Sequence, residues 1–493
     1  MIELHKLDSD VLVGHNISGF DLDVLLHRAQ ACKVPSNMWS KIGRLKRSTM
    51  PKLTKGSTIF GSGASPGIMS CIAGRLLCDT FLSSRELLRE VSYSLTHLAK
   101  TQLKKDLAPH VIRLMFQSSE SLMDLIECSE TDAWLSVELM FHLSILPLTR
   151  QLTNISGNLW GKTLQGARAQ RVEYLLLHAF HAKKYIVPDK FSSFPKETKV
   201  MKRKVNDAEN KEIDGLDVDN ANFENDSTNS DHGKAKKGPS YAGGLVLEPK
   251  RGLYDKYILL LDFNSLYPSI IQEYNICFTT VQRPANGSVP HLPSSKKTGV
   301  LPELLKNLVE RRRLVKSWLK NASGLKVQQL DIQQQALKLT ANSMYGCLGF
   351  SNSRFYAKPL AELITLQGRE ILQSTVDLVQ SNLNLEVIYG DTDSIMIYTG
   401  LDDIGKAKVI AGKVIQEVNK KYRCLEIDLD GLYKRMLLLK KKKYAAVKVQ
   451  SKDGTLHEDI ERKGLDMVRR DWSLLSKKLG DFCLDQILSG GNI

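Results

Sequence analysis

Two short apolar segments in the C-terminal half of the chain enclose a pair of aspartates, and no other feature limits the possible folds as strongly. Residues 385–389 precede Gly390-Asp391-Thr392-Asp393, and residues 394–398 follow it. Both segments have the length and composition of β-strands, and Gly390-Asp391 is typical of a tight turn. The sequence therefore predicts a β-hairpin that carries two carboxylates at its tip.

Two carboxylates at one hairpin tip favour a cation site. Like charges held close together raise each other's pKa unless a cation neutralises them. The surrounding residues offer hard oxygen ligands and few nitrogen or sulfur ligands, which favours Mg²⁺ over transition metals. The alternative is a solvated turn rich in aspartate, and Asp-Thr-Asp alone does not decide between the two.

Charge and cysteine content narrow the class of protein. The chain has 493 residues, enough for several domains, and a formal net charge of +15. So basic a chain favours a polyanionic partner, nucleic acid first, although the charge could serve solubility alone. Its 8 cysteines are dispersed and form no Cys-x-x-Cys pair, which argues against a zinc or iron–sulfur module. No apolar run approaches the roughly 20 residues of a membrane span, so we expect no membrane partner.

The N-terminal part has the pattern of a mixed α/β region. Residues 10–16 predict a strand, and residues 22–31, 133–146 and 171–182 predict helices. Residues 196–240 are rich in Lys, Asp, Glu, Asn and Ser, and we expect a disordered insertion there because such a segment cannot bury a core. No strand precedes residue 10, so we expect the chain to be a fragment of a longer protein.

A buried strand opens the second half. Residues 257–263 are apolar apart from Asp262 near the end, as expected of a strand buried on both faces. Two helices follow, from Pro302 to about residue 320 and from residue 326 to Tyr345, and Gly346 is expected to end the second. Later helices are expected at 360–381 and 404–422, and strands near residues 387, 395, 437 and 446.

Cations lie on one face of each helix of the first pair. Lys338, Asn342 and Tyr345 recur at helical spacing, and Arg312 and Lys316 share a face with apolar residues. Cations on two adjacent helices could grip a polyphosphate. A solvated polar face is the alternative.

Four consecutive lysines, Lys440 to Lys443, precede Tyr444. If the run is extended, alternate lysines face opposite sides, and at least two of them face one groove. The functional interpretation is contact with a phosphate backbone. The alternative is a sheet edge protected by lysine.

Five segments, in the same order along the chain, resemble the motifs of family B DNA polymerases. They are Tyr241-Ala242-Gly243-Gly244, residues 262–270, residues 338–346, residues 389–394, and Lys442-Lys443-Tyr444. The longer runs 269–280 and 463–472 resemble one eukaryotic branch, whose members initiate DNA replication by extending RNA primers. The resemblance covers nearly the whole chain apart from the predicted insertion.

The resemblance implies a set of site residues for template-directed DNA synthesis. Two Mg²⁺ ions would be held, and catalysis carried, by Asp262, Asp393, Asp391 and the carbonyl of Phe263. The nucleotide would contact Ser265, Leu266, Tyr267, Arg312, Lys316, Lys338, Asn342 and Tyr345. The DNA would contact Tyr241, Gly243, Gly244, Lys440, Lys441, Lys442, Lys443 and Tyr444.

The resemblance also implies a fold and partners. The fold is an α/β multidomain protein, shaped as a right hand. Its parts are a partial, inactive, ribonuclease H-like exonuclease-type domain at 1–150, a connecting segment at 151–195, palm at 241–300 and 350–480, fingers at 301–349, and the start of a thumb at 481–493. Implied partners are primer–template and RNA-primed DNA, dNTPs, primase subunits and an accessory B subunit, in the nucleus. Two alternatives stay open: an inactive scaffold with a polymerase fold, and another family B replicase.

The exonuclease-type region is expected to lack 3′–5′ proofreading. Residues 14–21 resemble the second exonuclease motif, with Asp21 at the position of a metal-binding carboxylate. The third motif of proofreading relatives is Tyr-x-x-x-Asp, and here Tyr93 is followed by His97 at the aspartate position. A neutral imidazole carries no charge to hold Mg²⁺, and a protonated one repels it.

Overall fold

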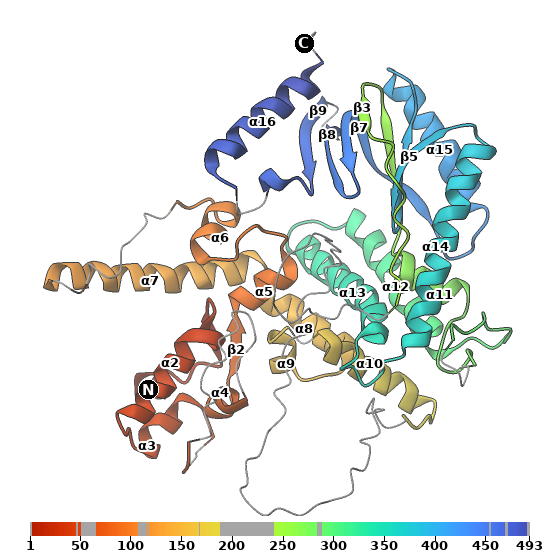
Figure 1. Cartoon of the computed structure of the whole chain (residues 1–493). Helices are drawn as coiled ribbons and strands as arrows, with labels where there is room; N and C mark the ends of the chain where they lie inside the picture. The colour runs from red at the N-terminus through yellow and green to blue at the C-terminus, as the bar shows by residue number, and fades with distance from the viewer. Residues whose placement is uncertain are drawn as a thin grey trace, which may run out of the picture. The chain divides into compact units, whose positions relative to one another are not determined.

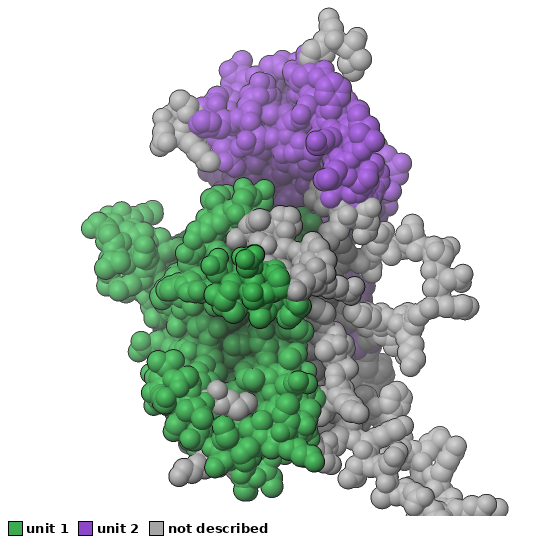
Figure 2. All heavy atoms as spheres, turned by 90° about the vertical axis from the view of Figure 1, so that its left-hand side faces the viewer, with its two compact units in different colours: residues 1–234, 315–340 green, residues 235–314, 341–493 purple. Residues whose placement is uncertain are grey.

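The chain forms two compact units in the computed structural model (Figures 1 and 2). Unit 1 comprises residues 1–234 and 315–340, and unit 2 comprises residues 235–314 and 341–493. The insertion predicted at 196–240 lies outside the described residues. The structure describes residues 2–45, 48–50, 66–106, 116, 118–166, 168–187, 241–282, 288–452, 455–468 and 472–490.

Unit 1 is built mainly of helices around one pair of parallel strands. β1 (Val11–Gly14) pairs with β2 (Leu76–Asp79), and Val11 lies opposite Leu76. The strand predicted at 10–16 is therefore confirmed, as is the helix at 22–31. The helical elements of this part are α1 (Ile2–Leu7), η1 (Ile17–Asp21), α2 (Leu22–Ala31), α3 (Ser36–Trp39), η2 (Ser40–Ile42), α4 (Pro66–Cys71), α5 (Thr80–Leu87), α6 (Leu95–Gln102), α7 (Ser119–His142), α8 (Ile145–Ser156), α9 (Trp160–Leu164) and α10 (Arg168–Ala182).

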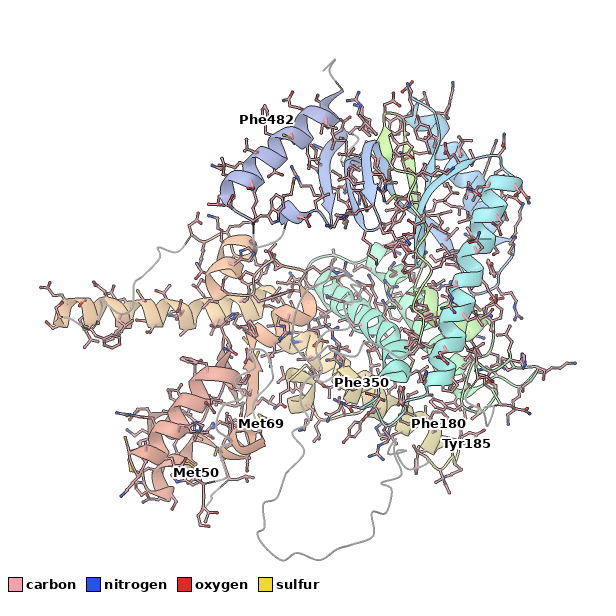
Figure 3. The ribbon with its side chains drawn as sticks, in the orientation of Figure 1. Met50, Met69, Phe180, Tyr185, Phe350 and Phe482 are labelled. Atoms are coloured by element: carbon pink, nitrogen blue, oxygen red, sulfur yellow. The ribbon has the colours of Figure 1, made fainter. Side chains whose placement is uncertain are left out.

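The single helix predicted at 133–146 is wrong, because the chain breaks between α7 and α8. Ser144 adopts the left-handed conformation, with φ 50°, and α8 begins at the next residue. The break allows Ile145 and Leu148 of α8 to be buried, at 0% and 1% exposure. The helix predicted at 171–182 is confirmed as α10. After it the chain turns back, and the ring of Tyr185 packs edge-on against Phe180 with centroids 5.9 Å apart (Figure 3).

Unit 2 contains an antiparallel sheet of seven strands. The strand order is β5-β6-β4-β7-β8-β9, and β3 pairs separately with β7. All the strands predicted in this half are confirmed. Their bounds are β3 (Gly252–Tyr254), β4 (Ile258–Phe263), β5 (Glu386–Asp391), β6 (Ser394–Tyr398), β7 (Ile427–Lys440), β8 (Lys443–Lys452) and β9 (Thr455–Lys463).

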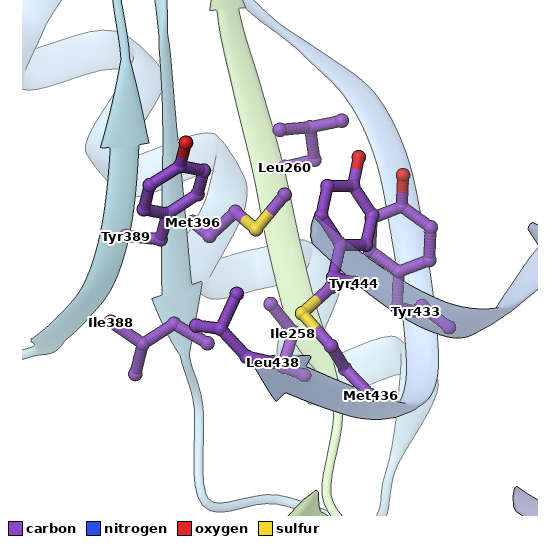
Figure 4. Close-up of a cluster of buried hydrophobic side chains, with 10 residues drawn as sticks. Ile258, Leu260, Ile388, Tyr389, Met396, Tyr433, Met436, Leu438 and Tyr444 are labelled. Atoms are coloured by element: carbon purple, nitrogen blue, oxygen red, sulfur yellow. The ribbon is translucent and has the colours of Figure 1, made fainter. Parts of the chain in front are cut away.

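Both faces of this sheet are covered. On one face, Ile258, Leu260, Met396 and Met436 form a buried cluster with aromatic residues of β5, β7 and β8 (Figure 4). Leu259 and the other residues of β4 that alternate with this set are buried as well. The helices that pack against strands are α14 (Lys358–Ser381), α15 (Ile404–Asn419) and α16 (Leu474–Ser489); unit 2 also contains α11 (Leu266–Glu273) and η4 (Asp466–Val468).

Two long helices each contribute residues to both units. α12 spans Val300–Lys320 and α13 spans Leu325–Gly349, and the four-residue connection ends at Gly324 with φ +58°. The prediction that Gly346 ends α13 is wrong. A glycine inside a helix costs about 1 kcal/mol relative to alanine, and burial of Cys347 and Leu348 in the next turn offsets this. Among the described residues, no helix combines the length and apolar composition needed to cross a membrane.

Candidate active site

Three aspartates converge in unit 2 where β4 meets the hairpin of β5 and β6. Asp262 of β4 lies opposite Ser394 of β6, and Asp391 of β5 lies opposite the same serine from the other side. The backbone N–H of Phe263 donates to the carbonyl of Asp393 at 2.8 Å. Sheet register therefore brings together carboxylates that are more than 120 residues apart in the sequence.

The predicted hairpin is confirmed, but its turn lies at Thr392-Asp393 and not at Gly390-Asp391. Thr392 has φ +59°, and the N–H of Asp393 donates to the carbonyl of Asp391 at 2.7 Å. Gly390 is a strand residue, and a Cβ there would lie 2.9 Å from Cδ1 of Leu247. Glycine at 390 therefore leaves room for Leu247, a packing role that the sequence pattern does not distinguish from a turn.

The segment that contains Gly243 and Gly244 supports this turn. The N–H of Thr392 donates to the carbonyl of Leu245 at 2.8 Å. A Cβ at Gly244 would lie 2.7 Å from the side chain of Thr392, so only glycine fits. Arg369 of α14 donates from Nη1 to the carbonyls of Ala242 and Gly243, at 3.1 and 2.8 Å. The sequence did not identify Arg369 as part of the site, because backbone carbonyls, its partners, leave no pattern of residue types.

Of the three aspartates, Asp262 is the one whose buried charge is least balanced by hydrogen bonds or nearby cations. Its Oδ1 atom is buried and has no hydrogen-bond partner among the described residues. Burial, followed by the nearby charges of Asp393 and Asp430, raises the pKa of Asp262 to about 7. Asp430 of β7 is a further acidic residue that the sequence reasoning missed. The only sequence pattern that could have pointed to Asp430 is its spacing of two residues from Asp428, which places both side chains on one face of a strand.

The pKa of Asp393 is also raised, first by burial and then by the charges of Asp391 and Asp430. The charge of Lys442 lowers the pKa of Asp393 and only partly offsets this rise. Two partly buried carboxylates are stabilised in ionised form when a cation joins them. Within the described residues, no group of three or more His, Cys, Asp or Glu side chains is arranged to hold a metal ion. The orphaned oxygen of Asp262 next to Asp393 nevertheless fits a hard divalent cation, because such ions bind carboxylate and carbonyl oxygens.

Asp391 has a different environment because its charge has a partner. Nζ of Lys442 lies 3.2 Å from Oδ2 of Asp391. The hydroxyl of Tyr389 donates to Oδ2 at 3.3 Å, and the hydroxyl of Thr392 donates to Oδ1 at 3.1 Å. The Tyr389 hydroxyl in turn accepts from the backbone N–H of Lys442 at 2.8 Å.

The four lysines form a turn, so the condition under which alternate lysines would face opposite sides is not met. Lys440 ends β7, Lys443 begins β8, and Lys442 has φ +62°. Three of the lysines form ion pairs: Lys441 with Glu248 at 2.5 Å, Lys442 with Asp391, and Lys443 with Asp466 at 2.8 Å. Tyr444 is buried at 7% exposure in the sheet cluster.

A stack of tyrosines lies beside the aspartates. The rings of Tyr267 (α11) and Tyr345 (α13) have centroids 4.3 Å apart and planes inclined by 29°. The hydroxyls of Tyr345 and Tyr241 lie 3.2 Å apart and form a hydrogen bond. Burial, together with the charge of Asp393, raises the pKa of Tyr267 to about 12. Tyr267 is therefore a neutral ring near the carboxylates at physiological pH.

The chain enters α11 through a residue in an unusual conformation. Ser265 precedes the helix with φ +51°, and Leu266 is buried at 4% exposure. This turn lies shortly after Asp262 and places Tyr267 in the first turn of α11. The predicted nucleotide residues Ser265, Leu266 and Tyr267 thus share one short segment with Asp262.

The predicted triphosphate contacts on α12 and α13 fall in both units. Arg312 is half-buried in unit 2, where burial lowers the pKa of its guanidinium, and Asn342 is exposed in the same unit. Lys316 and Lys338 are exposed and belong to unit 1. Contact of all four with a nucleotide stays a prediction.

Unit 1 contains a buried aspartate that the sequence reasoning missed. Asp79, at the end of β2, accepts hydrogen bonds from the backbone of Asn16, Ser18 and Phe81 at 2.9–3.1 Å, and also from the Ser18 hydroxyl. Both oxygens are therefore occupied by protein donors. Burial and the charge of Asp79 raise the pKa of Asp21.

His97, at the position where proofreading relatives carry aspartate, pairs with an acidic neighbour. Its Nε2 lies 3.1 Å from Oε2 of Glu90. The backbone N–H of His97 is held by Ser94, which caps α6. The side chain at 97 is thus engaged in a local contact within unit 1.

Comparison with known proteins agrees with this geometry and with the resemblance inferred from the motifs. Residues 158–492 match the sequence profile of DNA polymerase family B, and residues 1–98 match that of the DNA polymerase family B exonuclease domain. The DNA polymerase alpha catalytic subunits of Oryza sativa subsp. japonica and Arabidopsis thaliana are 79% and 73% identical over 100% of the chain. That of Mus musculus is 50% identical over 99% of it. The chain spans about a third of the length of these relatives, at 32%, 32% and 33%.

Proposed function

We propose that this chain, which belongs to DNA polymerase family B, catalyses template-directed transfer of a nucleotide from a dNTP to the 3′-hydroxyl of a primer. One observation carries the proposal. The buried Oδ1 of Asp262 has no hydrogen-bond partner among the described residues, and it lies in a cluster with Asp393 where both pKa values are raised. Such a pair is poised to bind divalent cations, the usual requirement of phosphoryl transfer.

Asp262, Asp393 and the carbonyl of Phe263 would hold two Mg²⁺ ions, with Asp391 adjacent. Bound divalent ions lower the pKa of an attacking hydroxyl and neutralise charge on the phosphates. The ion pair with Lys442 holds Asp391 in place, so that Asp262 and Asp393 are the carboxylates left to bind cations. The sheet fixes all three, and positioning supplies much of the rate enhancement in phosphoryl transfer.

The nucleotide would lie against the tyrosine stack. Tyr267, packed on Tyr345, offers a flat wall that excludes a 2′-hydroxyl, with Ser265 and Leu266 completing the sugar pocket. The triphosphate would be bound by Arg312, Lys316, Lys338 and Asn342 through charge-assisted hydrogen bonds.

The DNA would be bound through the lysine turn, residues 440–443, and through the backbone at Tyr241, Gly243 and Gly244. In this proposal residues 241–300 and 350–480 form the palm, residues 301–349 the fingers, and residues 481–493 the beginning of the thumb. Residues 1–150 form an exonuclease-type domain without proofreading activity.

The biological role that we propose is extension of RNA primers at the start of DNA replication in the nucleus. Relatives named DNA polymerase alpha catalytic subunit, at up to 79% identity, support this role over another family B replicase. Primase subunits and an accessory B subunit are the proposed protein partners. An inactive scaffold is disfavoured by the presence of Asp262, Asp391 and Asp393 together.

Primer extension tests the proposal. The chain is incubated with Mg²⁺, dNTPs and an RNA-primed template, beside a version extended to the full length of its relatives, of which the chain spans about a third. We expect template-directed extension, with longer products from the longer version because it grips DNA better. Absence of extension by both proteins would refute the proposed activity.

A further inference from the structure

The turn between β5 and β6 carries two of the three clustered aspartates, and its backbone conformation needs support from its surroundings. Thr392, between Asp391 and Asp393, has φ +59°. A β-branched residue seldom adopts this left-handed conformation, and it persists only where neighbouring structure holds it. The positions of both carboxylates therefore depend on what holds Thr392.

Residues 244–247 supply that support from one side of the turn. The backbone N–H of Thr392 donates to the carbonyl of Leu245 at 2.8 Å. Val246 forms an antiparallel β-bridge with Asp391. A displacement of residues 244–247 would therefore displace the turn and its carboxylates.

The start of this supporting segment is held by a side chain from another element. Residues 241–245 are irregular, so no helix or strand of their own fixes them. Nη1 of Arg369 donates to the carbonyls of Ala242 and Gly243, at 3.1 and 2.8 Å. The next residue, Gly244, passes so close to the turn that a Cβ there would lie 2.7 Å from the side chain of Thr392. The two hydrogen bonds of Arg369 thus end one residue before the contact with the turn.

The helix that carries Arg369 is a firm base for these hydrogen bonds. α14 packs against α11, β5 and β6, and Gly368, the residue before Arg369, is buried. A Cβ at Gly368 would lie 3.4 Å from the ring of Tyr267. Arg369 is half-buried, which strengthens charge-assisted hydrogen bonds because water competes less for the carbonyls. Burial raises the pKa of Tyr267 and of Tyr345, and the charge of Arg369 partly offsets both rises, so this charge also acts on the tyrosine stack.

We propose that Arg369 is a positioning residue for divalent-ion binding: it holds residues 242–244, which in turn hold the turn that carries Asp391 and Asp393. The inference rests on the proposed polymerase function, because the ions concerned are those that Asp262 and Asp393 would bind. Arg369 acts through two backbone segments and supplies no ligand to the ions. Direct contact of Arg369 with a DNA phosphate is the competing role, and the experiments below distinguish the two.

Hydrogen exchange tests the hold on the turn without metal or nucleic acid. Arg369→Met keeps a long side chain and removes the donors. Arg369→Lys keeps a charge, and one ammonium group can supply both hydrogen bonds, since both come from a single nitrogen atom in the arginine. In EDTA, we expect peptides that cover residues 388–394 to exchange roughly tenfold faster in Arg369→Met, and Arg369→Lys to restore most of the protection. Unchanged exchange in Arg369→Met overturns the proposal.

Mn²⁺ binding tests the consequence for the ions. Electron paramagnetic resonance measures it on the chain without nucleic acid or nucleotide, so that no phosphate is present. We expect Arg369→Met to bind Mn²⁺ roughly tenfold more weakly, which is the usual cost of removing a residue that orients metal ligands. Arg251→Met is the matched control, because it removes an exposed arginine of the same unit, and it should bind Mn²⁺ as the unmodified chain does. Equal Mn²⁺ affinity in Arg369→Met and Arg251→Met overturns the proposal.

Primer extension separates positioning from DNA contact. We expect Arg369→Met to need roughly tenfold more Mg²⁺ for half-maximal extension, with an unchanged KM for primer–template. A raised KM for primer–template at an unchanged Mg²⁺ requirement would assign Arg369 to DNA contact and overturn the proposal.

Asp393→Asn, measured in the same Mn²⁺ titration, separates failure of this proposal from failure of the polymerase assignment. If Asp393→Asn weakens Mn²⁺ binding and Arg369→Met does not, the proposed metal site stands and the role of Arg369 is refuted. If neither variant weakens it, the proposed metal site fails, and the role of Arg369 fails with it.

Discussion

Nζ of Lys442 lies 3.2 Å from Oδ2 of Asp391, and among the three clustered aspartates Asp391 is the one for which an ion pair is seen within the described residues. The two residues belong to different hairpins, the β7–β8 turn and the end of β5. The Tyr389 hydroxyl joins them, since it donates to Asp391 and accepts from the backbone of Lys442. The lysine turn is therefore joined to the aspartate cluster by one ion pair and one hydrogen-bonded tyrosine.

Lys442→Ala is expected to weaken primer–template binding by roughly tenfold and to reduce its salt slope by about 1, because it removes one cation that can contact a phosphate. Filter binding or anisotropy over a range of salt concentrations measures both effects. Lys434→Ala is the control, because Lys434 is also half-exposed and pairs with Glu458 at 2.6 Å on the same sheet. If Lys434→Ala and Lys442→Ala shift the salt slope equally, Lys442 has no specific role in DNA binding.

Asp262 should make the stability of the metal-free protein depend on pH. Its pKa of about 7 lies above the ordinary value, so the folded state binds the proton more tightly than the unfolded state. The stabilising effect of protonation is fully present below about pH 4 and is lost as the pH rises to about 7. We expect the Tm in EDTA to fall over this window, and to fall less in Asp262→Asn.

The effect of pH on Tm is measured by differential scanning fluorimetry. Asp428→Asn is the control, because Asp428 is the cross-strand neighbour of Asp262 and shows an ordinary exposed environment. Added Mg²⁺ should raise the Tm of the unmodified chain above about pH 7 more than that of Asp262→Asn. A steeper loss of Tm in Asp262→Asn would show that Asp262 is not the group responsible.

Tyr267→Ala is expected to raise ribonucleotide incorporation by roughly tenfold or more relative to deoxynucleotide incorporation, since it removes the wall beneath the sugar. Tyr267→Phe is the matched control, because it keeps the ring stacked on Tyr345 and loses only the hydroxyl. Steady-state incorporation of rNTP and dNTP opposite the same template base gives the ratio. If Tyr267→Ala discriminated between rNTP and dNTP as well as the unmodified chain does, Tyr267 would not be the residue that excludes ribonucleotides.

Proofreading is expected to be absent. By the motif resemblance, His97 replaces a metal-binding aspartate, and it pairs with Glu90. Both oxygens of Asp79, whose charge acts on Asp21, are occupied by protein donors. The measurement is Mg²⁺-dependent release of a mismatched 3′-terminal nucleotide, with Asp21→Ala as the control. Release by the unmodified chain that disappears in Asp21→Ala would contradict the prediction.

Local patterns were sufficient to predict the elements that hold the site. The apolar run before Asp262 and the two apolar segments around the aspartate pair appear as β4, β5 and β6, because strands buried on both faces need uninterrupted apolar residues. The family was predictable as well, since its motifs are short segments in a fixed order. Helix ends were less predictable. α13 continues through Gly346, because the burial of side chains in the next turn outweighs the low helix propensity of one glycine.

The pairings across the fold were not predictable from local patterns. The ion pair between Asp391 and Lys442 and the hydrogen bonds of Arg369 to residues 242 and 243 join segments that only tertiary folding brings together. Gly390 looked like a turn residue because close packing against Leu247 and turn formation both favour glycine. Asp79 was missed because one aspartate after a short apolar run carries no signal of its burial.

The central claim is that Asp262 and Asp393 together bind the divalent ions of the polymerase reaction. Asp393→Asn keeps the size of the side chain and removes its charge at a half-buried turn, so we expect an unchanged fold by circular dichroism. The most direct measurement is Mn²⁺ binding by electron paramagnetic resonance, with primer–template and a non-hydrolysable dNTP, combined with primer extension on the same samples. The account predicts that the unmodified chain binds about two ions and that Asp393→Asn loses at least one of them together with extension. Wild-type ion binding and extension by Asp393→Asn would contradict it.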